Sequence, residues 1–244
     1  MKKILTTVIA SGFGLVVFAQ GTVNWTGVGP SFIGQTNATV FSSFVASSGS
    51  PSGGSSGNTA LAVGGIYYYA LLTSASLNTA PTSLTQFSGT LSTAWLSTGL
   101  QATNNTGSNG RIVQYPAVQN AGTSNWVDTA TQNILMVGWS ANLGTTWASA
   151  LANLNNWSNF GTNSIGPAFF GVGQSVGSLT IGSANPGITV LGASVGQIND
   201  TVSGAGPLVM NILAIPSLGP VPEPSTMALA ALGGASLLLF RRRK

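Results

Sequence analysis

Short runs of β-branched and aromatic residues recur along most of this chain, and glycine or proline separates them at short intervals. Such runs, bounded by turn residues, are typical of the strands of sandwiches and barrels. The three tyrosines at 67–69 lie within one run, where aromatic rings fit a pleated surface. The pattern predicts strands at 38–46, 61–72, 111–118, 134–139, 168–172, 188–191 and 208–215.

One segment, residues 145–157, has helical rather than strand periodicity. Trp147, Leu151 and Leu154 recur at i, i+4 and i+7, which places them on one face of a helix. Thr145 is the expected N-cap, and the asparagines that follow Leu154 favour the helix end. The expected fold is therefore mainly β, a jelly-roll-like β-sandwich with one amphipathic helix laid across an opening.

Two polar stretches, residues 47–58 and 103–110, predict loops on composition alone. Disulfides cannot staple the fold, because the chain of 244 residues has no cysteine. About 200 residues are enough to build a hydrophobic core. We therefore expect residues 20–217 to form one body, a name that we keep for this range.

The first 19 residues have the order of a secretory signal peptide. Lys2 and Lys3 precede an apolar run that reaches Phe18, and small residues allow a cut before Gln20. This predicts export through the secretory translocon, followed by removal of residues 1–19 by signal peptidase. An uncleaved signal anchor is the alternative, but the run is short for a membrane span.

The C-terminal segment, residues 218–244, has a short proline-containing motif, then 16 uncharged residues rich in alanine and leucine, then a basic tail. As a helix, the 16 residues reach about 24 Å, against about 30 Å for the hydrocarbon core of a membrane. With its flanking residues the helix could span marginally, with the basic tail in the cytoplasm. A plain anchor helix and a buried core helix are the alternatives.

These three parts, in this order, resemble the PEP-CTERM sorting signal of Gram-negative bacteria. The resemblance implies processing by an exosortase, a membrane transpeptidase-like enzyme with a cysteine nucleophile, and release or attachment at the cell surface, often in cells that make exopolysaccharide. Residues 134–157 also resemble a segment of uncharacterised secreted PEP-CTERM proteins, with no known activity. The residues expected to be recognised as the sorting motif, without doing chemistry themselves, are Pro222, Glu223, Pro224, Arg241, Arg242 and Arg243.

Charged residues make up 4% of the chain, against roughly 25% in ordinary soluble domains. The net charge of +4 belongs to the ends, because between residues 20 and 221 only Arg111, Asp128 and Asp200 are charged. This distribution excludes a nucleic-acid-binding face. With no histidine or cysteine, zinc sites, Ser-His-Asp triads and thiolate nucleophiles are excluded, so we expect no enzyme, metal or cofactor.

Asp128 and Asp200 form the one carboxylate pair of the body, and each is followed by threonine. This resembles the Asp-Thr-Gly of aspartic proteases, but Ala130 and Val202 stand where the glycine would be. Both aspartates lie in polar stretches typical of turns. A hydrolase that uses them, as a protease or a glycosidase, is the less favoured alternative.

Six tryptophans give the body its second candidate chemistry. Trp139 and Trp147 are expected in the core, where large aromatic side chains usually pack. Trp95, Trp126 and Trp157 have polar neighbours and are the candidates for a surface platform that stacks on sugar rings. A non-catalytic carbohydrate-binding module is therefore an alternative function.

The function favoured by the sequence is that of an exported surface or exopolysaccharide-matrix protein with a structural or adhesive role in a biofilm. The C-terminal helix is expected to hold it briefly in the inner membrane before processing. An almost uncharged surface can hydrogen-bond to glycans or to other copies of the chain. The expected partners are therefore the exosortase, exopolysaccharide or the protein itself.

Overall fold

The computed structural model describes parts of the body, and all structural statements below apply to these residues. The described part of the chain is mainly β, with 49% of its residues in strands, one α-helix and sheets that do not close. The predicted signal peptide and sorting segment lie outside the described residues. The described ranges are 20–24, 34–45, 57–59, 66–105, 111–115, 121–159, 167–182, 188–192, 194–198 and 208–214.

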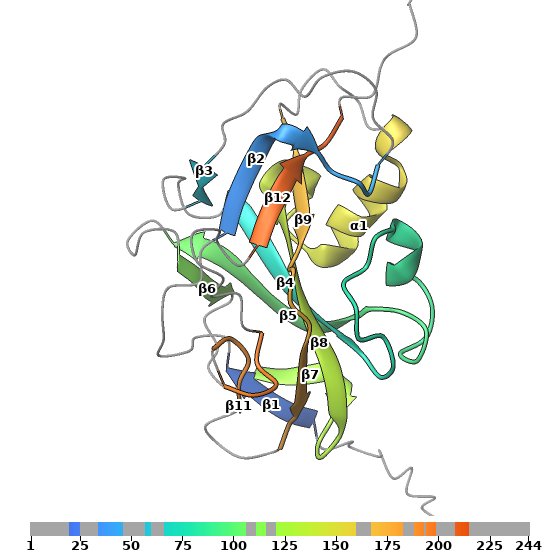
Figure 1. Cartoon of the computed structure of the whole chain (residues 1–244), viewed down its shortest axis with the longest axis vertical. Coiled ribbons are helices and arrows are strands. Elements are labelled where there is room, and N and C mark those ends of the chain that lie inside the picture. The colour runs from blue at the N-terminus through green and yellow to red at the C-terminus, as the bar shows by residue number, and fades with distance from the viewer. Residues whose placement is uncertain are drawn as a thin grey trace, which may run out of the picture.

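Two sheets form the described body (Figure 1). The large sheet has nine strands in the order β3-β2-β12-β9-β8-β4-β5-β6, with β10 also paired to β8, and the small sheet has the order β11-β1-β7. The small-sheet strands are β1 (Gln20–Asn24), β7 (Ala121–Val127) and β11 (Ile188–Thr189). The large-sheet strands are β2 (Gly34–Phe41), β3 (Gly57–Asn58), β4 (Tyr67–Ser74), β5 (Leu96–Asn105), β6 (Arg111–Tyr115), β8 (Thr131–Ser140), β9 (Phe169–Val172), β10 (Gly177–Thr180) and β12 (Leu208–Ile212).

The α-helix, α1 (Trp147–Asn155), confirms the helical period, and its N-cap is one residue later than expected. The hydroxyl of Thr146, not Thr145, accepts the backbone N–H of Ser149 at 3.2 Å. Short 3₁₀ turns lie at Leu84–Phe87 (η2), Ala141–Leu143 (η4) and Trp157–Asn159 (η5). Among the described residues, no helix combines the length and the hydropathy that a membrane crossing requires.

The antiparallel pair β4–β8 is the centre of the large sheet, with eight residue pairs from Tyr67↔Ser140 to Ser74↔Asn133. Both faces of this pair are buried. Side chains alternate between two cores, because successive strand residues point to opposite faces. The first core contains the side chains of Tyr69, Leu71, Ile134 and Met136. The second core contains those of Ala70, Leu72, Leu135 and Val137.

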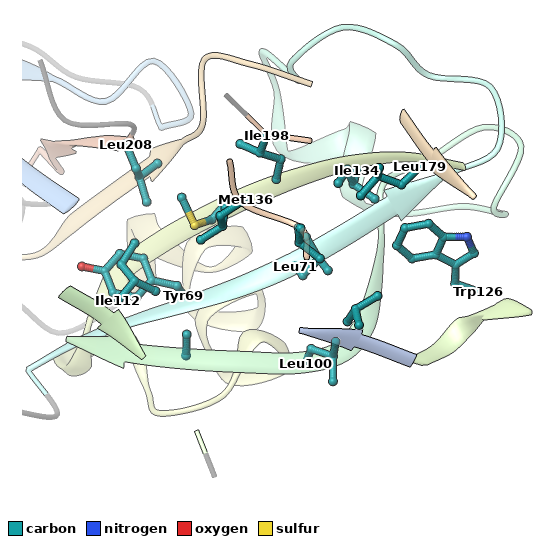
Figure 2. Packing of buried hydrophobic residues seen from close by; sticks show 14 of the residues in the cluster. Tyr69, Leu71, Leu100, Ile112, Trp126, Ile134, Met136, Leu179, Ile198 and Leu208 are labelled. Atoms are coloured by element: carbon teal, nitrogen blue, oxygen red, sulfur yellow. The ribbon is translucent and has the colours of Figure 1, made fainter. Parts of the chain in front are cut away.

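The first core, which we call the inter-sheet core, joins the large sheet to the small sheet. Val23 of β1 and Trp126 of β7 contribute side chains from the small sheet, and both are fully buried. Figure 2 shows the Trp126 indole beside Leu179 of β10, next to Ile134. Burial of such apolar surface is the main force that holds the two sheets together.

The second core, the helix-side core, covers the opposite face of the large sheet and is rich in aromatic rings. Trp139 of β8 meets Trp147 of α1 with ring centroids 5.7 Å apart, and Phe87 of η2 meets Trp147 edge-on at 5.1 Å. Edge-to-face and tilted pairs suit the charge distribution of aromatic rings. The helix therefore docks through Trp147, Ala150 and Leu154, whereas Leu151 is half-buried.

Each predicted strand overlaps an observed one, but the sequence missed β1, β5, β7 and β10. β3 lies in the expected loop 47–58, and β5 continues to Asn105, inside the expected turn 103–110. These strands are rich in polar residues, and their backbone groups are satisfied by neighbours distant in the sequence.

The pairs β2–β12 and β1–β11 are parallel, unlike the antiparallel Greek keys of a jelly roll.

Gly171 permits β9 to lie close against β12. A Cβ atom at this position would meet the carbonyl oxygen of Val209 and lie 2.8 Å from the Cα of Met210. We expect Gly171→Ala to lower the free energy of unfolding by about 2–3 kcal/mol, because backbone atoms would have to shift. Urea unfolding checks this, with the exposed Ser178→Ala as a control that changes stability by less than about 0.5 kcal/mol. Equal midpoints for the two variants would contradict this packing.

Candidate functional site

The described chain ends beside the helix-side core, just before the predicted sorting segment. The Leu213 N–H donates to the Ala168 carbonyl oxygen at 2.8 Å, and the Trp157 indole N–H donates to the carbonyl oxygen of Ala214. Ala214 is itself buried. The chain therefore leaves the folded body from a fixed point, and the seven residues 215–221 reach at most about 25 Å before the motif at Pro222.

The three candidate sugar-stacking tryptophans are not on the surface. Trp95 and Trp126 have 0% exposure and Trp157 has 8%, so the expectation that they present open stacking faces is wrong. Trp95 and Trp157 pack in the helix-side core and Trp126 packs in the inter-sheet core. Trp139 and Trp147 are also buried, which confirms the prediction made for them.

For Trp126, polar neighbours misled the prediction because successive side chains of a strand point to opposite faces. Trp126 is buried while Asn125 and Val127 on either side of it are exposed. Its indole N–H donates to the carbonyl oxygen of Ala130 at 2.7 Å, which satisfies the polar atom inside the core. The indole nitrogen of Trp95 is buried without a hydrogen-bond partner.

Asp128 lies in the tight turn between β7 and β8, as the sequence predicted. The turn is closed by the Ala130 N–H donating to the Val127 carbonyl oxygen at 3.2 Å. Oδ1 of Asp128 is buried and has no hydrogen-bond partner. The next residue, Thr129, has φ +64°, in the left-handed region where a β-branched side chain is strained.

The carboxylate pair suggested by the sequence includes Asp200, which lies outside the described residues. Arg111 opens the edge strand β6. Within the described ranges, no three residues with metal-ligating carboxylate, imidazole or thiol groups cluster. The residues of the sorting motif, Pro222 to Pro224 and Arg241 to Arg243, likewise lie outside the described part.

A buried polar network that the sequence analysis missed ties β4 and β5 to β2, which lies toward the opposite end of the strand order of the large sheet. The hydroxyl groups of Tyr69 and Thr59 lie 3.1 Å apart, and Thr59 donates to the carbonyl oxygen of Gly34 at 2.9 Å. Asn104 donates to the Thr59 carbonyl oxygen at 3.3 Å and accepts the Tyr67 N–H at 3.0 Å. The one signal in the sequence was the tyrosine triplet, which predicted the strand but not the hydrogen-bond partner of the Tyr69 hydroxyl.

Burial shifts the acid–base behaviour of two tyrosines in this region. It raises the pKa of Tyr69 well above the usual value, more than the hydrogen bond with Thr59 lowers it, and nearby Tyr67 adds to the rise. Burial also raises the pKa of Tyr67, against a smaller lowering by its hydrogen bond with Thr36. The described network is therefore built to stay neutral and structural.

Comparison with known proteins identifies the C-terminus. Residues 220–244 match the family model of the PEP-CTERM protein-sorting motif. This confirms the resemblance seen in the sequence and implies processing by an exosortase and export toward the cell surface. No curated protein and no solved structure matches the chain.

The tyrosine pKa values predict how stability depends on pH. Because folding raises the pKa of Tyr69, its contribution is complete below about pH 10, where the unfolded tyrosine ionises, and is lost as pH rises further. We expect a melting temperature that is nearly flat from about pH 5.5 to 8.5, since the chain has no histidine, and that falls above about pH 10.

Tyr69→Phe tests the assignment to this residue. It should cost about 1 kcal/mol at pH 7, through the lost contact with Thr59, and should make the alkaline fall shallower. Scanning calorimetry across the pH range measures both effects. An alkaline limb as steep in Tyr69→Phe as in the parent would show that another group causes it.

Proposed function

We propose that this protein is a non-enzymatic structural or adhesive element of the cell surface or exopolysaccharide matrix, delivered there as an exosortase substrate. The sorting motif at residues 220–244 is the observation that carries the proposal. In this scheme a signal peptide of residues 1–19 directs translocation, and the C-terminal helix holds the precursor in the inner membrane until the exosortase acts. The described body would then be a sandwich-like unit exposed outside the cell.

The body has features that suit such a role. Its charged residues are so few that an uncharged hydrogen-bonding surface must keep it hydrated. At the ends of β8 and β10 the exposed side chains include Thr131, Ser178 and Thr180, with the hydroxyl groups of Thr131 and Thr180 hydrogen-bonded to each other. Neutral donors and acceptors of this kind suit hydroxyl-rich polysaccharide or another copy of the chain.

The carbohydrate-binding alternative loses its proposed platform, because Trp95, Trp126 and Trp157 are buried. Among the described residues, neutral polar side chains are the remaining candidates for glycan contacts, which favours broad adhesion over a dedicated sugar-stacking site. The hydrolase alternative would need Asp128 to meet a second carboxylate, and no described residue supplies one.

Processing tests the sorting step directly. In a host with an exosortase, Glu223→Ala should accumulate as a membrane-bound precursor, while the parent chain is released or transferred with its C-terminal segment removed. The matched control is Pro216→Ala, a proline before the motif, which should be processed normally. Mass spectrometry of the C-terminus measures the outcome, and equal processing of Glu223→Ala or of the parent in an exosortase-deficient strain would contradict the proposal.

Self-association tests the structural role. We expect the exported body to associate to a similar extent from about 0.05 to 0.5 M salt, because attraction between neutral groups is hardly screened. The double variant Thr131→Lys/Thr180→Lys should associate less at low salt and regain association at high salt, since it adds repulsion at this surface. Light scattering measures both, and strong salt dependence of the parent chain would contradict the proposal.

A further inference from the structure

The turn between β7 and β8 holds a chemical arrangement that the proposed function does not use. Thr129 adopts φ +64°, and its hydroxyl donates a hydrogen bond to the carbonyl oxygen of Asp128 at 2.7 Å. The hydroxyl is therefore held against the carbonyl group of the peptide bond that joins Asp128 to Thr129. A positioned nucleophile next to a carbonyl group is the starting arrangement for acyl transfer.

The same peptide bond is held at its nitrogen. The Thr129 N–H donates to the carbonyl oxygen of Ile181 at 2.8 Å. If the nitrogen became a protonated amine, this hydrogen bond would become charge-assisted and stronger. The Ile181 carbonyl therefore favours departure of this nitrogen.

Asp128 supplies the acid–base group of the turn. One of its carboxylate oxygens, Oδ1, is buried and accepts no hydrogen bond, so it is not committed to the local backbone as a turn aspartate usually is. A carboxylate next to the hydroxyl in sequence can relay the hydroxyl proton to the nitrogen. Thr129 is exposed, which gives water access to the product of the first step.

We propose that the chain cleaves itself between Asp128 and Thr129. Oγ1 of Thr129 adds to the carbonyl carbon of Asp128, the C–N bond breaks, and the hydroxyl proton passes to the nitrogen, which becomes the α-amine of Thr129. The two residues are then joined by an ester, which water hydrolyses to a C-terminal carboxylate on Asp128 and a free Thr129 hydroxyl. One water is consumed and nothing is oxidised or reduced.

Cleavage would leave the fold in place. β7, which precedes the bond, pairs with β1 in the small sheet, and β8, which follows it, pairs with β4 over eight positions. The two pieces would therefore stay together until the protein is denatured. Opening the turn also releases Thr129 from its strained backbone conformation, so relief of strain favours cleavage.

The test uses the full chain, purified in detergent from an exporting host and incubated at neutral pH. A denaturing gel should show two fragments that co-migrate under native conditions, and sequencing should find a new N-terminus beginning Thr129-Ala130-Thr131. Hydroxylamine should accelerate cleavage and leave a hydroxamate on Asp128, because it attacks esters. Fragment masses distinguish this bond from Asn109–Gly110, which hydroxylamine also attacks.

Variants separate self-cleavage from other causes. Thr129→Ser keeps the hydroxyl and should still cleave, Thr129→Val should not, and Asp128→Asn should cleave about a hundredfold more slowly. Thr93→Val, at an exposed threonine in another turn, is the matched control and should cleave as the parent does. If Thr129→Val does not fold, Thr129→Gly removes the hydroxyl in a conformation that glycine adopts freely.

Two results would overturn the proposal. The first is a parent chain that stays intact with and without hydroxylamine while its melting curve shows a folded protein. The second is cleavage of the same bond in folded Thr129→Val or Thr129→Gly, which would identify a contaminating protease.

Discussion

The structure depends on one pair of strands, β4 and β8, whose two faces are both covered. Their side chains alternate between the inter-sheet core and the helix-side core, so both cores depend on the same two strands. A chain with no cysteine and 4% charged residues must obtain its stability mainly from burial of apolar surface. The small sheet packs on one face of this strand pair and α1 packs on the other, so both faces are buried.

The low charge of the body and the sorting motif belong to one physical picture. Basic residues are concentrated at the ends of the chain, and the body between keeps one cation and two anions. Inside it, threonine and asparagine side chains satisfy buried backbone groups, as Asn104 does for Tyr67. Neutral hydrogen bonds thus replace the ion pairs of an ordinary soluble domain, and histidine titration has no part in the stability.

The tryptophans show where local sequence fails as a guide. Trp95, Trp126 and Trp157 have polar neighbours in the chain, yet all three are buried. For Trp126, in strand β7, the reason is that successive side chains of a strand point to opposite faces. Trp157 also holds the carbonyl oxygen of Ala214, a residue 57 positions later in the chain. Contacts at that separation leave no trace in a short window of sequence.

The sequence by itself determined the strand-rich class, the helix near residues 147–155 and the sorting motif at the C-terminus, because each depends on the pattern within a short contiguous segment. Only the tertiary structure decided the parallel pairs β2–β12 and β1–β11, the polar strands β5 and β7, the tyrosine network and the burial of the candidate stacking residues. Local periodicity reports which face of an element is apolar, whereas the partner of that face, and of each backbone hydrogen-bonding group, is set by segments far away in the chain.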